Sequence, residues 1–247
     1  MEIVGGLALN LLASVIFTVS GFVGGRAYAT FRRRRALGHV RALVGSGKRI
    51  TVVFPASTLP GPEGTPVNAI RMSLAEGAAI ARIGQLCRDA KPDTDMYLVH
   101  PNDHHPNRGS FVMVGDPAMS VFAKRWLATN FPHLRISPEN RRVDYDGTRW
   151  ETNVVEGVVR RDFGFIAIGR TETGQRFALL WGASELGTNI AARAYGDLHR
   201  QLSRERYEKA VRGQSWLYVA RGDVDGYGVR TDDVGNVMIV AIYPGQN

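Results

Sequence analysis

Apolar and polar residues alternate along this chain in blocks of strand length and helix length. Short apolar runs at residues 50–54 and 111–114, bounded by Pro or Gly, are typical of buried strands. Apolar positions at helical spacing occupy residues 74–88, directly after Ser73, which forms a capping box with Glu76 at a helix N-terminus. The pattern therefore predicts the strand and helix units of an α/β domain.

The rest of the chain continues in the same manner, with two turn signatures between extended runs. Asp144–Gly147 predicts a hairpin or an irregular insertion, and Thr173–Gly174 predicts a turn between two strands. Because strands and helices alternate elsewhere, we expect a mainly parallel sheet with helices on both faces and added antiparallel strands. Further strands are expected at residues 96–99, 163–168, 177–181, 216–220 and 237–243, and further helices at residues 118–129 and 189–202.

The N-terminal segment, residues 3–25, carries no charged side chain. About 20 predominantly apolar residues are enough to cross a bilayer. The cations follow this segment, whereas a cleaved signal peptide has them in front. Because Lys and Arg beside a span remain in the cytoplasm, we expect a single transmembrane helix in the cell membrane, with the N-terminus outside. The alternatives are a buried helix and a signal peptide.

One stripe of this segment is small or polar. Gly6, Asn10, Ser14 and Thr18 recur at a spacing of four residues. Small residues let helix backbones approach closely in lipid, and Asn or Ser can form hydrogen bonds across the interface. The stripe therefore favours a homo-oligomer, and the alternative is a helix that lies alone.

The net charge of +8 at first suggests a nucleic-acid-binding protein. Eight cations lie between Arg26 and Arg49, where there is no Asp or Glu, and they equal the net charge of the chain. The remaining sequence is balanced, which argues against general nucleic-acid binding. We expect a transmembrane helix at residues 1–25, a basic juxtamembrane collar and hinge at residues 26–48, and a soluble cytoplasmic domain at residues 49–247. The collar residues expected to lie against the lipid bilayer are Arg26, Arg32, Arg33, Arg34 and Arg35.

Ligands of open α/β sheets bind beyond the carboxyl ends of the strands. Four loops qualify here, at residues 55–65, 100–107, 115–117 and 182–188, and the last two are short strand-to-helix turns. At Gly115–Pro117, Asp116 would repel a phosphate, so this residue either binds a ribose hydroxyl or caps its helix. The turn at residues 182–188 offers glycines for close backbone approach, hydroxyl groups, and free N–H groups at a helix N-terminus, which suit an anion. The alternative for this turn is a connection tightened for packing. The candidate ligand-binding residues are Gly182, Ser184, Gly187, Thr188 and Asn189.

Two further patterns are weaker. His100, Asp103, His104 and His105 look like metal ligands. Adjacent loop histidines seldom converge on one ion, however, and no Cys partner exists, so we expect no metal site. Residues 45–48 lack the upstream Gly and the preceding strand of a phosphate-binding loop.

Two runs in the soluble domain carry a resemblance to a known family. The Val-Met-Val-Gly-Asp-Pro run that ends at Pro117, and the Gly182-x-x-x-x-Gly187-Thr-Asn turn before a helix, resemble Rossmann-like prokaryotic sensor domains. Those domains bind nucleotide signals, and some are joined to transmembrane helices in defence effectors. The resemblance covers about half of the soluble domain, and Asp116 stands where the paired-Gly signature has a Gly. It implies a Rossmann-like fold and a binding role for Gly182, Ser184, Gly187, Thr188 and Asn189.

Together, these features lead us to expect a single-pass membrane-anchored cytoplasmic domain that senses a nucleotide-like anionic ligand and signals through oligomerisation. One alternative is a membrane-bound hydrolase or transferase acting on a nucleotide or sugar nucleotide, for which Glu185 is the candidate catalytic base. A second alternative is a non-catalytic membrane scaffold. No residue pattern assigns a cofactor.

Overall fold

The chain divides into two compact units, residues 1–36 and residues 37–247. Residues 37–44, which the sequence places in the collar and hinge, thus belong to the second unit, as do all the elements named below. The structure is a computed structural model, and for residues 57–60 and 66–69 it describes the backbone alone. The described residues are 25, 26, 28, 30, 36–44, 50–54, 57–60, 66–69, 73–90, 109–212, 214–224 and 234–246.

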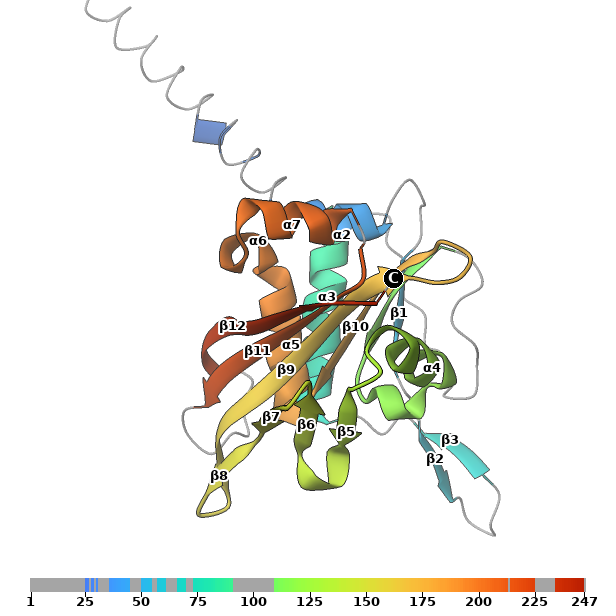
Figure 1. Ribbon diagram of the computed structural model, residues 1–247, viewed down its shortest axis with the longest axis vertical. Helices are drawn as coiled ribbons and strands as arrows, with labels where there is room; N and C mark the ends of the chain where they lie inside the picture. The colour runs from blue at the N-terminus through green and yellow to red at the C-terminus, as the bar shows by residue number, and fades with distance from the viewer. Residues whose placement is uncertain are drawn as a thin grey trace, which may run out of the picture. The chain divides into compact units, whose positions relative to one another are not determined.

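A seven-stranded mixed sheet forms the centre of the second unit (Figure 1). Its strands are β1 (Ile50–Val53), β4 (Ser110–Val114), β8 (Asn153–Val155), β9 (Val158–Arg170), β10 (Arg176–Gly182), β11 (Trp216–Val224) and β12 (Val234–Pro244). The strand order is β1-β4-β10-β9-β11-β12, and β8 also pairs with β9. β1, β4 and β10 run parallel to one another, whereas the pairings of β9 and β11 are antiparallel.

The prediction of a mainly parallel sheet is wrong. Of the six strand pairings described in this sheet, two are parallel and four are antiparallel. Parallel neighbours need a crossover of about a dozen residues or more, and the connection from β9 to β10 is a tight turn. The N–H of Gly174 donates to the carbonyl oxygen of Thr171 at 2.9 Å, and Gly174 has a φ of +80°. Such a short connection makes the two strands an antiparallel hairpin.

The fold class needs a second correction, which concerns the helices. Within the described residues, no helix has both the length and the apolar character needed to cross a bilayer. The predicted span at residues 1–25 lies outside the described residues except for Gly25. The described helices are α2 (Gly38–Val44), α3 (Leu74–Ala90), α4 (Val121–Asn130), α5 (Glu185–Gly196), α6 (Leu198–Gln201) and α7 (Arg204–Val211), with 3-10 turns η2 (Pro117–Met119) and η3 (Pro138–Asn140).

Two hydrophobic cores lie on opposite faces of the sheet. α3 and α5 lie side by side on one face, together with α2, α6 and α7 (Figure 1). The other face is covered by α4 and a small antiparallel sheet. β9 separates the cores by strand alternation, because Ile166 and Ile168 face one core while Phe165 and Ala167 face the other. The small sheet consists of β5 (Arg135–Ser137), β6 (Arg142–Tyr145) and β7 (Thr148–Glu151), and a separate hairpin pairs β2 (Ser57–Pro60) with β3 (Pro66–Ala69).

The helix α5 lies unusually close to β9. A Cβ atom on Gly164 of β9 would overlap the backbone of α5, at the nitrogen of Ala191 and the carbonyl oxygen of Gly187. A Cβ atom on Gly187 would in turn overlap the carbonyl oxygen of Phe163. Glycine at both positions therefore brings the first turns of α5 against the strand, and this packing fixes the helix N-terminus at the end of β10.

Candidate functional site

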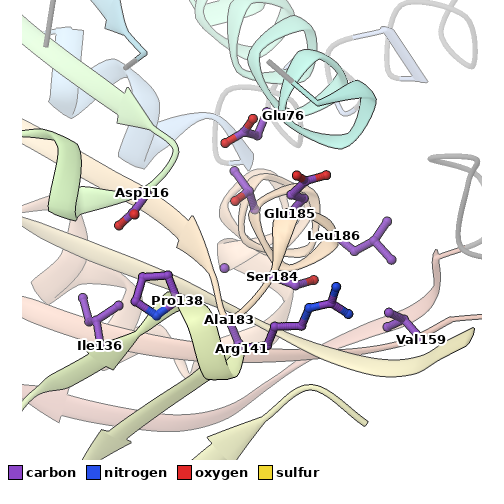
Figure 2. Close-up of a pocket in the computed structure, with 12 residues that line it drawn as sticks. Glu76, Asp116, Ile136, Pro138, Arg141, Val159, Ala183, Ser184, Glu185 and Leu186 are labelled. Carbon is purple, nitrogen blue, oxygen red and sulfur yellow. The ribbon is translucent and has the colours of Figure 1, made fainter. Parts of the chain in front are cut away.

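A cavity of about 430 Å³ opens at the carboxyl ends of β4 and β10 (Figure 2). These two strands are parallel neighbours, so the turns that follow them emerge at the same edge of the sheet. Asp116 comes from the turn after β4, and Ser184 comes from the turn after β10. The structure thus brings together the two strand-to-helix turns that the sequence singles out.

The polar side chains of the cavity come mainly from helix starts. Glu76 comes from the first turn of α3, Glu185 from the first turn of α5, and Asp116 from the cap of η2. Figure 2 shows Glu76 and Glu185 on the same side of the cavity, with Arg141 toward the opposite side. Among the described lining residues, three carboxylates thus face one basic side chain, which makes the cavity acidic.

Apolar side chains complete the walls. Ile136 and Pro138 lie at one end of the cavity in this view, and Leu186 and Val159 lie at the other (Figure 2). Apolar walls with a few convergent polar groups are typical of small-molecule sites, and the cavity volume lies within their usual range. The arrangement suits a ligand with a flat or apolar part and several polar groups.

The turn after β10 is held in place by a buried carboxylate. Asp162 of β9 is 0 % exposed. Its Oδ2 accepts a hydrogen bond of 2.5 Å from the hydroxyl of Ser184, and its Oδ1 accepts one of 2.8 Å from the hydroxyl of Thr152. The backbone N–H groups of Phe163 and Gly187 donate to the same carboxylate. Four donors therefore converge on one buried acid.

These four hydrogen-bond donors stabilise a carboxyl group that is buried inside the protein. Burial raises the pKa of Asp162 above its ordinary value, and the four hydrogen bonds oppose that rise. Ser184 precedes α5 as its N-cap residue but makes no side-chain cap hydrogen bond, and its hydroxyl donates to Asp162. The N–H of Gly187 belongs to the first turn of α5, so Asp162 supplies the negative group that a helix N-terminus favours.

The same carboxylate reaches the opposite wall through Thr152. The backbone N–H of Thr152 donates to the carbonyl oxygen of Arg141 at 3.0 Å, and its hydroxyl lies 3.3 Å from the same oxygen. Arg141 has a left-handed backbone with a φ of +48°, directly after η3. Asp162 thus connects the α5 side of the cavity, at Ser184, with the side that carries Arg141.

The predicted ligand-binding residues take different places in this arrangement. Gly182, Ser184 and Thr188 line the cavity. Gly187 packs against β9, and Asn189 is 2 % exposed within α5; neither is among the lining residues. The α5 helix starts at Glu185, four residues before the predicted start, so the second half of the predicted binding turn is helix.

The two predicted acidic candidates both line the cavity. Glu185 is exposed at the first residue of α5. Asp116 acts as a cap, because its Oδ1 accepts the N–H of Ala118 at 2.8 Å. A side chain that caps a 3-10 turn and still lines a cavity is compatible with both roles expected for it.

Sequence reasoning missed Asp162 and Arg141. The predicted strand begins at Phe163, whereas β9 begins five residues earlier, so the predicted sheet does not include Asp162. A charged residue directly before a buried apolar run was the available signal. Arg141 had none, because it comes from an irregular segment between η3 and β6.

Metal chemistry finds no support in the described part of the chain. No three His, Cys, Asp or Glu side chains come close enough there to hold an ion. His100, Asp103, His104 and His105 lie outside the described residues. The described lining residues also contain no His, Cys or Lys, so their chemistry is that of carboxylates, hydroxyls and one guanidinium.

The comparisons with family models and curated proteins assign no role to the cavity. No protein-family model matches the chain, and no curated protein is significantly similar to it. The resemblance to Rossmann-like sensor domains therefore stays a prediction.

Proposed function

We propose that this domain is a sensor that binds a small ligand of the nucleoside or nucleotide class in the cavity at the ends of β4 and β10. The observation that carries the proposal is the position of the cavity. Two neighbouring parallel strands end there, and ligands of open α/β sheets bind beyond such ends.

The lining residues support this class of ligand. The apolar side chains at the two ends of the cavity offer surfaces for a base. Asp116 and Glu76 carry carboxylate oxygens, which accept hydrogen bonds from ribose hydroxyl groups. Arg141 offers a planar guanidinium that can stack on a base or pair with one negative group.

The alternative of a hydrolase or transferase rests on Glu185 alone. Catalysis would require a base held within hydrogen-bond reach of a reacting group, and Glu185 is an exposed carboxylate at a helix start. We therefore place binding before catalysis. The membrane location and the oligomer, which depend on the N-terminal segment, stay predictions.

The experiment is a thermal-shift and calorimetric screen of the full chain against four nucleosides and their 5′-mono- and diphosphates. A ligand present at 100 times its dissociation constant adds about 2.7 kcal/mol to the stability. Leu186→Trp fills the cavity and abolishes the shift. Val121→Trp is the matched control, because Val121 is 69 % exposed on α4 and is not among the lining residues.

Two results would count against the proposal. If no compound of the panel binds, this ligand class is wrong. If a compound is converted to product and Glu185→Ala abolishes that conversion while the fold persists, the enzyme alternative replaces the sensor.

A further inference from the structure

The N-terminus of α5 is already occupied by a negative group of the protein itself. The N–H of Gly187 donates to Asp162, and so does the hydroxyl of Ser184 at 2.5 Å. Helix N-termini that bind phosphate leave such donors free for the ligand. Here a fully buried carboxylate takes one N–H group of the helix start, that of Gly187, and the Ser184 hydroxyl before any ligand arrives.

Two further carboxylates beside the N-terminus of α5 add negative groups to the same region. Glu185 and Glu76 line the cavity on the α5 and α3 side (Figure 2). Glu76 also receives the N–H of Ser73 at 3.0 Å, which completes the capping box of α3. Both helix starts therefore carry a negative side chain of the protein at the place where a phosphate would otherwise bind.

The basic side chain of the cavity lies away from the starts of α3 and α5. Arg141 is the one basic side chain among the described lining residues, and it lies toward the side of the cavity opposite Glu76 and Glu185 (Figure 2). A single negative group on a ligand can pair with Arg141. A chain of phosphates would extend from there into a region that contains three carboxylates and the buried Asp162.

We infer that the cavity recognises its ligand through uncharged hydroxyl or amino groups directed at α5, that it rejects phosphate there, and that Asp162 is the residue that sets this specificity. The inference rests on the proposed function and deepens it, because it selects the nucleoside over its polyphosphates. Asp162 acts by occupying the Gly187 N–H and the Ser184 hydroxyl with a carboxyl group that cannot move aside, since it is buried on a central strand.

The first test uses the wild-type full chain and compares each nucleoside with its own 5′-diphosphate by calorimetry. We expect the diphosphate to bind roughly tenfold more weakly or worse, because like charges a few ångström apart repel in a partly desolvated cavity. A diphosphate that binds as tightly as its nucleoside would overturn the inference and leave the proposed function intact.

The second test asks whether Asp162 causes the weaker binding of the diphosphate. Asp162→Asn should reduce the difference between nucleoside and diphosphate several-fold. Glu185→Gln is the matched control, since it removes an exposed negative charge from the same helix turn and should reduce the difference less. Equal effects of the two variants would show that overall charge, and not Asp162, sets the preference.

A third measurement does not depend on a nucleoside ligand or on a variant of Asp162. Inorganic phosphate is titrated into the wild-type chain and into Leu186→Trp, and binding is followed by phosphorus NMR. Phosphate that binds the basic N-terminal segment will bind both proteins alike. Saturable binding present in the wild type and lost in Leu186→Trp would place phosphate in the cavity and overturn the inference. Its absence supports the rejection of phosphate at α5, whatever the nucleoside screen gives.

Discussion

The hydroxyl of Ser184 donates a 2.5 Å hydrogen bond to the carboxylate of Asp162 and so joins the start of α5 to a strand 22 positions earlier in the sequence. This bond ties the turn after β10 to a buried residue of the central sheet. The stability of the cavity therefore depends on the hydrogen bonds of Asp162 as well as on hydrophobic packing.

Thr152→Val tests that dependence. Valine has nearly the shape of threonine, so the main change is the lost donor to a buried carboxylate. We expect a loss of about 1–3 kcal/mol in the free energy of unfolding, measured by chemical denaturation. Thr148→Val, at an exposed position of β7, is the control and should change stability little. Equal effects of the two substitutions would contradict the importance of the Asp162 network.

Gly164→Ala tests the close approach of α5 to β9. The added methyl group would meet fixed backbone atoms of the helix, so we expect a loss of about 3 kcal/mol by the same measurement. In Gly196→Ala the methyl group meets only the end of the Leu86 side chain, at 3.2 Å. That control should be nearly neutral, and a nearly neutral Gly164→Ala would show that the helix can shift away from the strand.

Arg141→Gly separates binding from stability. Glycine adopts the left-handed backbone of this position without the strain of an L-residue, and the hydrogen bonds from Thr152 use only the backbone oxygen. We expect stability to rise by up to about 1 kcal/mol, whereas binding of any ligand found in the screen weakens. Glu156→Gly, at a φ of +52° and away from the lining residues, should give the stability gain without the loss of binding. An unchanged affinity in Arg141→Gly would remove Arg141 from the binding site.

His39 should make the protein sensitive to acid. Burial lowers the pKa of His39 from 6.5 to about 3. Between these values the unfolded chain binds a proton that the folded chain does not, so stability is retained above pH 6.5 and is lost as the pH falls toward 3. The loss from this residue is about 1.4 kcal/mol per pH unit.

The measurement is denaturation at several pH values in His39→Gln and in the wild type. The variant should lose less stability per pH unit than the wild type over this range. His133→Gln, at an exposed histidine, should follow the wild type. A variant curve parallel to the wild-type curve would show that His39 is protonated in the folded protein.

The position of the cavity could be predicted from the sequence, because apolar runs identify buried strands and turns identify their ends. The run at residues 111–114 lies within β4 and the run at residues 177–181 lies within β10. Asp116 and Ser184 follow these strands, and parallel pairing brings them together. Local patterns are enough here, since both side chains belong to turns that directly follow strong strand signals.

The rest of the site depends on where β9 begins, on its register with β10 and on a single residue between η3 and β6, and the local patterns do not fix these. Asp162 reaches Ser184 only because β9 pairs antiparallel with β10. Arg141 reaches the cavity through the loop that connects η3 to β6. The sequence therefore predicts a turn that suits an anion, whereas three of the four charged side chains that line the assembled cavity are acidic.

The cavity lies where the parallel half of the sheet meets its antiparallel half, at the boundary between β10 and β9. Its two sides consequently come from separate stretches of chain. One is a rigid base of strand ends and helix starts, and the other is the segment that contributes Ile136, Pro138 and Arg141. Substitutions in that second segment can change what the cavity accepts without altering the base, so relatives of this protein should share Asp162 and α5 and differ most from β5 to Arg141.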